Sequence, residues 1–418
     1  MLVYLQGESV SRKRVGVLGK TFVEWSGGVD FITYLANAIA ANDAYEVYLF
    51  VPDSNEALHL YEYKPPRYLH NRLKARYRRI SPYTLMNPAK PQLGNVLKKI
   101  KIIYYRNNLD GFFYTLFKYK IDIVIPTTET LGKSFPKPWV GYIWDFQHRH
   151  LPQYFSAGDI KGRDVAFKNI LNDSYAVLVN SKQTKEDIYK FLPSAARNKK
   201  IVSLPFAPNL DSSWLKISGD QTAKKYGIPN PYIIICNQFW VHKSHPTAIE
   251  AFAKLCKSHP KLHLVCTGKM EEPRYPNYIS QVRQMVKRLH IDNEVHFMGY
   301  ISKDDQIGLL KRALLLIQPT LYEGGPGGGA AYNAVALGIP MVISDIPVNL
   351  EIKNNSRVTF FKAGSSEDLA DKIESVISHK ERAISNSVLR DASKKNLLEL
   401  STCLSNLLET TISKSRRN

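Results

Sequence analysis

Short apolar runs recur along the chain and are separated by amphipathic segments. In the first half they predict strands at 15–19, 45–51, 121–127, 140–146, 176–181 and 201–206. Runs of this kind are typical of strands that are buried on both faces of a parallel sheet. Helices are predicted between them, including 30–42 and 184–192. The alternation indicates one parallel sheet covered by helices.

The same alternation starts again after Trp214. It predicts strands at 232–239, 262–268, 295–300, 314–320, 341–344 and 358–361. Helices are predicted at 246–257 and 366–378, where apolar side chains three or four residues apart form one face. The end of the chain predicts one long helix with a basic tail.

The two series predict an α/β fold with two facing Rossmann-like, doubly wound domains, because 418 residues exceed what one compact core usually holds. The predicted parts are an N-terminal extension (1–13), a first domain (14–207), a linker (208–224), a second domain (225–385) and a C-terminal helix (386–418). Facing sheets bring the carboxyl ends of their strands to one cleft, where open α/β sheets bind ligands.

Positive charge is concentrated in one part of the chain. The formal net charge is +20, and residues 58–120 hold fourteen lysines and arginines against two acidic residues. The basic residues alternate with tyrosine and leucine, a pattern suited to anionic lipid headgroups. Nucleic acid would feel the same attraction, but the sequence has no helix-turn-helix, zinc or RNA-sheet signature. We expect an anionic membrane surface and no nucleic acid as partner, with a solvated basic face as the alternative.

The sequence also bears on location and redox state. No apolar run reaches the ~18 residues needed to cross a bilayer, and residues 1–14 lack the apolar core of a signal peptide. We expect a cytoplasmic protein, peripheral at the inner face of the cytoplasmic membrane. The four cysteines have no metal-ligand spacing, so we interpret them as reduced core residues.

A glycine-rich turn between an apolar strand and a small-residue helix is the most informative feature. Within 319–340, the carboxylate of Glu323 is followed by five glycines: Gly324, Gly325, Gly327, Gly328 and Gly329. A backbone without Cβ atoms can approach a ligand closely, and the next helix offers its first N–H groups to an anion. The pattern predicts a diphosphate cradle, and a plain strand-to-helix turn is the alternative.

A lysine is expected beside this loop. The stretch 237–246 follows the first strand of the second domain and precedes a helix, which places Lys243 at a helix start. A fixed cation there can neutralise charge that develops on a departing phosphate. The alternative is an exposed loop lysine.

The order of these motifs resembles group 1 (family 4) nucleotide-sugar glycosyltransferases, which are retaining enzymes of the GT-B fold. The likeness rests on Lys243, the 319–323 strand end, the glycine loop and the 334–340 continuation. In the first domain, the turn that contains Gly27 and Gly28 is similar to that family's acceptor-side glycine loop. The segments 145–152 and 237–243 look like a subgroup linked to O-antigen, capsule and other surface polysaccharides.

The resemblance implies a mechanism. The first domain would bind a glycan or lipid-linked acceptor, and the second would bind a nucleoside-diphosphate sugar. The sugar would move to the acceptor with retention and without a protein nucleophile, so the enzyme would act by positioning and by stabilising the diphosphate. Lys243 and the amides around Gly325, Gly327, Gly328 and Gly329 would bind the diphosphate, and Glu323 would orient the sugar or the loop.

The sequence departs from the family pattern at three positions. Gln238 stands where the family commonly has an arginine, and Trp144 stands where a histidine usually precedes Asp145. Asn333 occupies the ribose-binding position of a second carboxylate if the loop carries a two-residue insertion. An amide there can still hydrogen-bond a hydroxyl, but more weakly than a carboxylate.

Two histidines follow Asp145 and are candidates for the missing one. His148 and His150 lie three and five residues beyond it, where either could hydrogen-bond a sugar hydroxyl or the acceptor. The alternative is that both pack or solvate the loop. Asp145 itself is the stronger candidate for contact with the substrate.

The remaining expectations concern metals and rival functions. No Asp-x-Asp motif occurs, so we expect metal-independent transfer with no cofactor besides the nucleotide sugar. A sugar-nucleotide epimerase or a phosphorylase could use the same fold. The departures could also mark a catalytically degenerate binding subunit.

Overall fold

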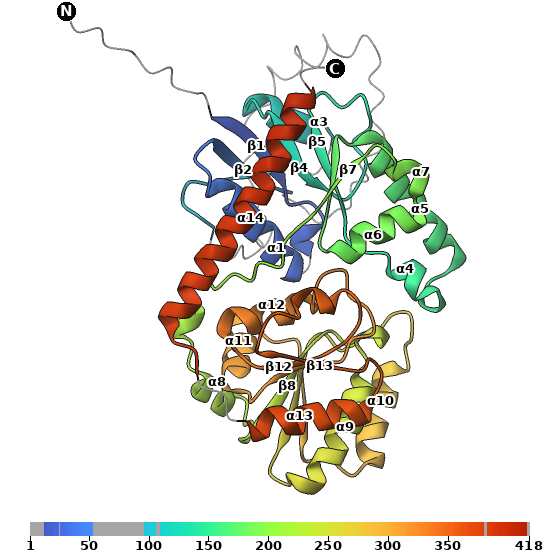
Figure 1. Ribbon diagram of the computed structural model, residues 1–418, viewed down its shortest axis with the longest axis vertical. Helices are drawn as coiled ribbons and strands as arrows, with labels where there is room; N and C mark the ends of the chain where they lie inside the picture. The colour runs from blue at the N-terminus through green and yellow to red at the C-terminus, as the bar shows by residue number, and fades with distance from the viewer. Residues whose placement is uncertain (1–11, 25, 53–95, 106–108, 380–382, 416–418) are drawn as a thin grey trace, which may run out of the picture.

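The protein is described by a computed structural model that covers residues 12–24, 26–52, 96–105, 109–379 and 383–415. It has two α/β domains, one above the other in Figure 1. This confirms the predicted fold class of two Rossmann-like parallel-sheet domains with a C-terminal helix. Most of the basic segment at 58–120, including Arg72–Arg79, lies outside the described residues.

The first domain is built on a seven-stranded sheet in the order β3-β2-β1-β4-β5-β6-β7, and every pairing is parallel. Its strands are β1 (Lys13–Leu18), β2 (Tyr45–Pro52), β3 (Lys101–Tyr105), β4 (Ile123–Thr127), β5 (Trp139–Ile143), β6 (Ala176–Val179) and β7 (Lys200–Ser203). Buried apolar clusters cover both faces of this sheet. The double burial explains why its strands appear as nearly continuous apolar runs.

The edge strand β3 was not predicted from the sequence. It lies within the basic segment, and its first two residues are exposed. Lys101 crosses to β2, where its ammonium pairs with Glu46 and lies 3.2 Å from the hydroxyl of Tyr48. A short edge strand of this kind lacks the apolar run of a central strand.

The second domain has a six-stranded parallel sheet in the order β10-β9-β8-β11-β12-β13. Its strands are β8 (Tyr232–Cys236), β9 (His263–Thr267), β10 (Val295–Gly299), β11 (Leu316–Gln318), β12 (Met341–Ser344) and β13 (Val358–Phe361). All six were predicted, but β8 and β11 end earlier than expected. Asn237 and Thr320, just past those ends, hydrogen-bond through their side chains instead of extending the sheet.

Helices flank both sheets. In the first domain they are α1 (Ser26–Ala40), α3 (Leu109–Lys118), α4 (Gln147–His150), α5 (Ala157–Asp173), α6 (Lys182–Phe191) and α7 (Pro193–Ala196). In the second they are α8 (Gly219–Lys225), α9 (His245–Ser258), α10 (Tyr278–Arg288), α11 (Lys303–Arg312), α12 (Gly328–Leu337) and α13 (Ser366–Ser378). Short 3₁₀ helices are η1 (Phe22–Glu24), η3 (Pro152–Tyr154), η4 (Trp214–Lys216), η5 (Val241–Lys243) and η6 (Asn349–Ile352).

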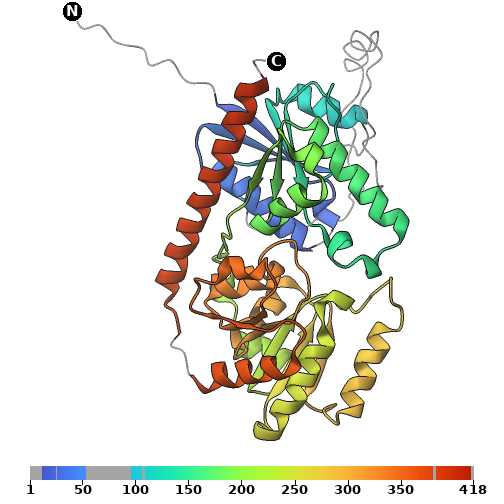
Figure 2. The same ribbon diagram turned by 45° about the vertical axis from the view of Figure 1, so that its right-hand side comes forward.

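The C-terminal helix α14 (Asn386–Ser415) returns from the second domain to the first, as Figures 1 and 2 show. Leu400, Leu404 and Leu408 join the apolar cluster that includes Ile39 of α1. Ser405 adds polar contacts, since its hydroxyl accepts a bond from Asn42 at 3.0 Å. The helix therefore belongs to the first domain's core although it follows the second in sequence.

Among the helices of the described ranges, none is both long enough and apolar enough to cross a lipid bilayer.

Candidate functional site

The glycine loop joins β11 to α12 and folds back on itself. Gly327 and Gly328 have positive φ angles of 63° and 62°, which favour glycine. A Cβ on Gly328 would lie 3.0 Å from Oε2 of Glu323, and a Cβ on Gly324 would lie 2.4 Å from the carbonyl oxygen of Trp144. A Cβ on Gly329 would meet no heavy atom within 4 Å. The loop is thus tightly packed at its start and open at the first turn of α12.

Lys243 and Glu323 meet beside this loop. Lys243 ends η5, and its Nζ lies 2.5 Å from Oε1 of Glu323. Both side chains are nearly buried, with 10% and 9% of their surface exposed. The structure therefore places the lysine beside the predicted diphosphate loop, where it forms an ion pair with the loop's own carboxylate.

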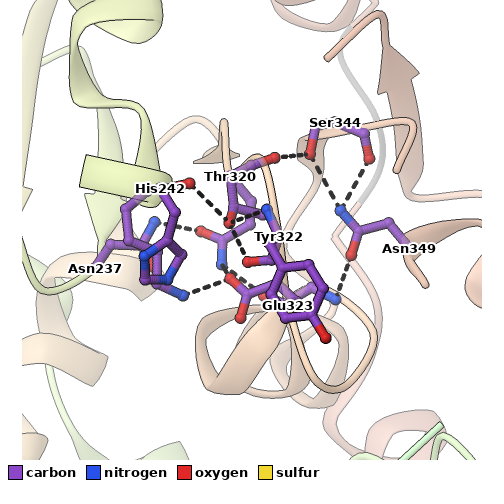
Figure 3. A network of polar contacts seen from close by, with 10 residues as sticks. Asn237, His242, Thr320, Tyr322, Glu323, Ser344 and Asn349 are labelled. Atoms are coloured by element: carbon purple, nitrogen blue, oxygen red, sulfur yellow. Dashed lines mark hydrogen bonds and ion pairs between the residues drawn. The ribbon is translucent and has the colours of Figure 1, made fainter. Parts of the chain in front are cut away.

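A buried amide chain supports this pair; Asn237 and Glu323, at its two ends, are labelled in Figure 3. Asn237 donates to Oε1 of Gln318 at 2.6 Å, and Gln318 donates to the carbonyl oxygen of Gly327 at 2.6 Å. Gln318 also lies 3.5 Å from Oε1 of Glu323. Gln318 was not predicted from the sequence, although a polar residue at the end of an apolar strand is itself a signal.

A second buried network fixes the other side of the loop. Asn349 accepts a bond from the N–H of Gly327 at 2.7 Å and donates to the carbonyl oxygen of Ser344 at 2.9 Å. The hydroxyl of Ser344 donates to the carbonyl oxygen of Thr320 at 2.6 Å. Thr320 in turn donates to the carbonyl oxygen of Tyr322 at 2.7 Å. Each of the three side chains is fully buried, so the chain of bonds holds the loop rigidly.

Two buried histidines flank Lys243. The carbonyl oxygen of His242 accepts a bond from the N–H of Leu321 at 2.8 Å, which ties η5 to the glycine loop. His245 stacks on Phe239 with ring centroids 4.0 Å apart. Burial, together with the charge of Lys243, lowers the pKa of His242 to about 2 and that of His245 to about 3. Both rings are therefore neutral near pH 7, and Lys243 is the cation of this segment.

Asp145 approaches the loop from the first domain. It follows β5, and its carboxylate accepts a bond from the N–H of Gln147 at 2.9 Å. Burial raises the pKa of Asp145, and Glu323 adds to this increase, whereas the Gln147 N–H and the charges of Arg163 and Lys243 oppose it. The carboxyl group therefore lies in the electrostatic range of both members of the Lys243–Glu323 pair.

The two candidate histidines of the first domain point in different directions. His148 is fully buried among Phe146, Phe155 and Phe167, and its Nε2 lies 3.0 Å from Oδ1 of Asp164. Burial also lowers its pKa. With no exposed surface, His148 is placed as the packing alternative expects.

His150 lies at the domain boundary instead. Its side chain is 30% exposed, and its Nε2 lies 2.9 Å from Oδ2 of Asp187. Its ring centroid lies 5.4 Å from that of Tyr322 in the second domain. This placement is compatible with contact to a substrate.

The other predicted residues are distributed around the same region. Gly27 and Gly28 lie in the first turn of α1, and Gln238 is half-buried after β8. Asn333 is buried on α12, one turn beyond Gly329. Together with the loop, these positions surround the carboxyl ends of β1, β8 and β11.

The two domains meet directly at the glycine loop. The carbonyl oxygen of Gly324 accepts bonds from the hydroxyls of Ser181 and Thr184, each at 3.0 Å. The hydroxyl of Tyr322 accepts a bond from the N–H of Phe146 at 2.8 Å. Glu351 reaches across to the first turn of α6, where it accepts bonds from the N–H groups of Lys182 and Gln183 at 3.1 and 2.9 Å.

This geometry can be compared with known proteins. Residues 220–395 match the family model of glycosyl transferases group 1. The match supports a group 1 glycosyltransferase, and it contains Lys243, Glu323 and the whole glycine loop. The first turn of α12 offers N–H groups without intrahelical acceptors, which suits an anionic ligand.

Two curated relatives match part of the chain. The mannosylfructose-phosphate synthase of Agrobacterium fabrum is 25% identical over 123 residues, which are 29% of this chain and 27% of that protein. The O-antigen chain mannosyltransferase RfbU of Salmonella typhimurium is 28% identical over 124 residues, 30% of this chain and 32% of that protein. The chain thus spans about a third or less of the length of these relatives.

Solved structures match over almost the whole chain. The sucrose-phosphate synthase of Thermosynechococcus elongatus has a TM-score of 0.60 at 15% identity and covers 97% of this chain and 98% of its own. HepE of Anabaena, solved with UDP and glucose, has a TM-score of 0.59 at 14% identity and covers 96% and 100%. These similarities establish the GT-B fold of this chain.

Proposed function

We propose that the protein transfers a sugar from a nucleoside-diphosphate sugar to an acceptor hydroxyl. The observation that carries the proposal is the placement of Lys243 and Glu323 beside the open first turn of α12. The match of residues 220–395 to glycosyl transferases group 1 supports it. HepE, a protein of the same fold, was solved with UDP and glucose, which is consistent with a nucleotide donor at this position.

In the proposed reaction, the diphosphate binds at the N-terminus of α12 and Lys243 moves from Glu323 toward it. The carboxylate of Glu323 is then released to hold a hydroxyl of the donor sugar. As the bond from the sugar to the phosphate breaks, the acceptor oxygen bonds to the anomeric carbon on the same face and its proton passes to the leaving diphosphate. The charge that develops on the diphosphate is stabilised by Lys243 and by the helix N–H groups. We propose retention of the anomeric configuration and transfer without a metal.

For the acceptor we propose a glycan or lipid-linked oligosaccharide of a cell-surface polysaccharide. RfbU, one of the partial relatives, is an O-antigen chain mannosyltransferase, which supports this choice. The basic and aromatic composition of residues 58–120 supports docking on an anionic membrane. Asp145 and His150, at the boundary on the first-domain side, are the proposed contacts to the donor sugar or the acceptor.

Ligand binding tests the proposal most directly. A panel of nucleoside diphosphates and nucleotide sugars is added to wild type, Lys243→Ala, Lys243→Arg and the control Lys269→Ala, whose lysine is exposed. We expect one nucleotide to raise the melting temperature, since a ligand at 100 times its Kd stabilises by about 2.7 kcal/mol. The shift should vanish in Lys243→Ala and persist in the control.

Two results would contradict the proposal. One is the absence of any shift with wild type across the panel. The other is an equal shift in Lys243→Ala and wild type, because the diphosphate site would then lie elsewhere. Lys243→Arg keeps the charge opposite Glu323, so it separates loss of binding from loss of folding. With a donor identified, NMR of the product anomer tests retention.

A further inference from the structure

One arginine at the domain boundary has an unusual environment. Arg163 lies on α5 of the first domain, and its guanidinium carbon is 4.8 Å from the ring centroid of Phe155 and 5.8 Å from that of Trp144. Its nearest carboxylate oxygen is Oδ1 of Asp145, at 3.6 Å, which is beyond hydrogen-bond distance. Its side chain is 32% exposed. Among the described residues, no group accepts a hydrogen bond from its guanidinium.

Other arginines of this region differ in this respect. Arg149 binds both carboxylate oxygens of Asp164. Arg274 binds both oxygens of Glu272 at 2.9 and 3.0 Å, and Glu272 has no exposed side-chain surface. Each of those two guanidinium groups is hydrogen-bonded to both oxygens of one carboxylate. Arg149 and Arg274 lie over aromatic rings as well, at 5.9 Å and 5.5 Å. Arg163 differs from them in having no hydrogen-bonded carboxylate within the described residues, so the rings orient it while its N–H edge stays available.

Arg163 also lies beside a residue that contacts the glycine loop. Its partner Asp145 packs on the glycine loop, since a Cβ on Gly324 would lie 3.0 Å from Cβ of Asp145. Gly324 directly follows Glu323, whose carboxylate holds Lys243. The charges of Arg163, Lys243 and Glu323 all act on the carboxyl group of Asp145. The two cations therefore approach one region from opposite domains.

The negative charge of a donor's diphosphate would be better neutralised by two cations than by Lys243 alone. Lys243 is neutralised by Glu323 at 2.5 Å, so the second domain offers a diphosphate little net positive charge through this pair. A guanidinium presents parallel N–H groups that match two phosphate oxygens. Its aromatic contacts leave this edge pre-oriented, which lowers the entropy lost on binding.

We propose that Arg163 is a second phosphate-binding cation of the diphosphate site, supplied by the opposite domain. The proposal rests on the function proposed above. It means that the donor is held from both domains at once, so that a bound diphosphate keeps the two domains together beside Asp145.

The test uses calorimetric titration of wild type, Arg163→Gln and Arg163→Lys. The ligands are the nucleoside diphosphate identified in the panel, inorganic pyrophosphate and the parent nucleoside. Arg163→Gln should lower the affinity for the nucleoside diphosphate and for pyrophosphate about ten- to a hundredfold, as expected for a lost charge-assisted contact. The affinity for the nucleoside should not change. Arg163→Lys should recover part of the affinity, because it restores the charge but not the paired N–H groups.

A matched control is Arg283→Gln. The guanidinium of Arg283 also lies over an aromatic ring, 5.1 Å from the centroid of Phe297, but in the second domain. The Arg283→Gln variant should bind the diphosphates with the same affinity as wild type. Arg163→Ala with added guanidinium chloride gives a further check, since free guanidinium should restore diphosphate binding if the group contacts phosphate and not if the residue only packs.

The outcomes separate this proposal from the broader function. If Arg163→Gln binds the diphosphates like wild type while Lys243→Ala does not, the assignment of Arg163 fails and the transferase proposal stands. If Arg163→Gln raises only the KM for a phosphorylated acceptor, Arg163 binds a phosphate group of the acceptor. The assignment of Arg163 to the donor diphosphate is then wrong. If wild type binds no nucleoside diphosphate, both proposals fall.

Discussion

Glu351 gives the sharpest prediction about how the two domains are held together. Its carboxylate caps α6 of the opposite domain through the N–H groups of Lys182 and Gln183. The same helix start carries Ser181 and Thr184, whose hydroxyls hold the carbonyl oxygen of Gly324. Glu351→Ala should therefore loosen both the interface and the glycine loop.

The size of the effect follows from the capping geometry. Loss of an N-terminal helix cap costs about 0.5–2 kcal/mol, and the helix dipole adds about 0.3–1 kcal/mol for a carboxylate. Lys182 is exposed and Gln183 is half-buried, so water can replace part of the lost interaction. We expect a net loss of about 1–2 kcal/mol, which shifts the ratio of closed to open domains about five- to thirtyfold.

Hydrogen exchange read by mass spectrometry measures this shift. Peptides that contain Lys182 and Gln183 should exchange faster in Glu351→Ala, with an intermediate rate in Glu351→Gln, which keeps one acceptor oxygen but loses the charge. Glu250→Gln, an exposed change on α9, is the control and should exchange like wild type. Identical exchange in all four proteins would refute the idea that Glu351 holds the domains together.

The remaining predictions concern stability, pH, metals and membranes. Asn349→Ala should lower the free energy of unfolding in urea by about 2–4 kcal/mol, because it leaves the buried N–H of Gly327 and the carbonyl of Ser344 without their partner. The unfolded chain protonates histidine near pH 6.5, whereas folded His245 has a pKa of about 3, so stability should fall as pH drops from 6.5. His245→Phe should make that fall shallower in urea titrations at several pH values; an unchanged slope would contradict it. EDTA should leave sugar transfer intact, and activity that is lost and then regained with magnesium or manganese would refute metal independence. Reversing five basic charges should release the protein from anionic vesicles in a sedimentation assay, and unchanged binding would exclude this segment as the membrane anchor; the residues are Arg72, Lys74, Arg76, Arg78 and Arg79.

Sequence patterns predicted the fold well because the strands are buried on both faces. Twelve of the thirteen described strands correspond to predicted apolar runs, and the exception is β3 at a sheet edge. The glycine loop and Lys243 were also placed side by side correctly, since both follow strands whose carboxyl ends share one edge of the sheet. The local hydrophobic pattern and the rules of parallel-sheet topology were sufficient to predict the strands and the position of Lys243 beside the loop.

The failures arise where side-chain direction or distant pairing decides the site. His148 and His150 are two residues apart on one helical turn, so they point about 200° apart, one into the core and one to the domain boundary. The local pattern does not indicate which of the two histidines faces inward. Asn349 lies 22 residues from the amide of Gly327 that it holds, and Arg163 belongs to the other domain. Such contacts are set by tertiary packing and have no local signal.

These contacts also change which residues make up the proposed donor site. The glycine loop is anchored within its own domain by Asn349, yet its carbonyl at Gly324 is held by hydroxyls from α6 of the other domain. The described shape of the loop is therefore supported by groups from both domains. Separation of the domains would remove the contacts of Ser181 and Thr184, so we expect an isolated second domain to bind a diphosphate more weakly than the whole chain. The first domain would then contribute to the proposed diphosphate site as well as to the proposed acceptor site.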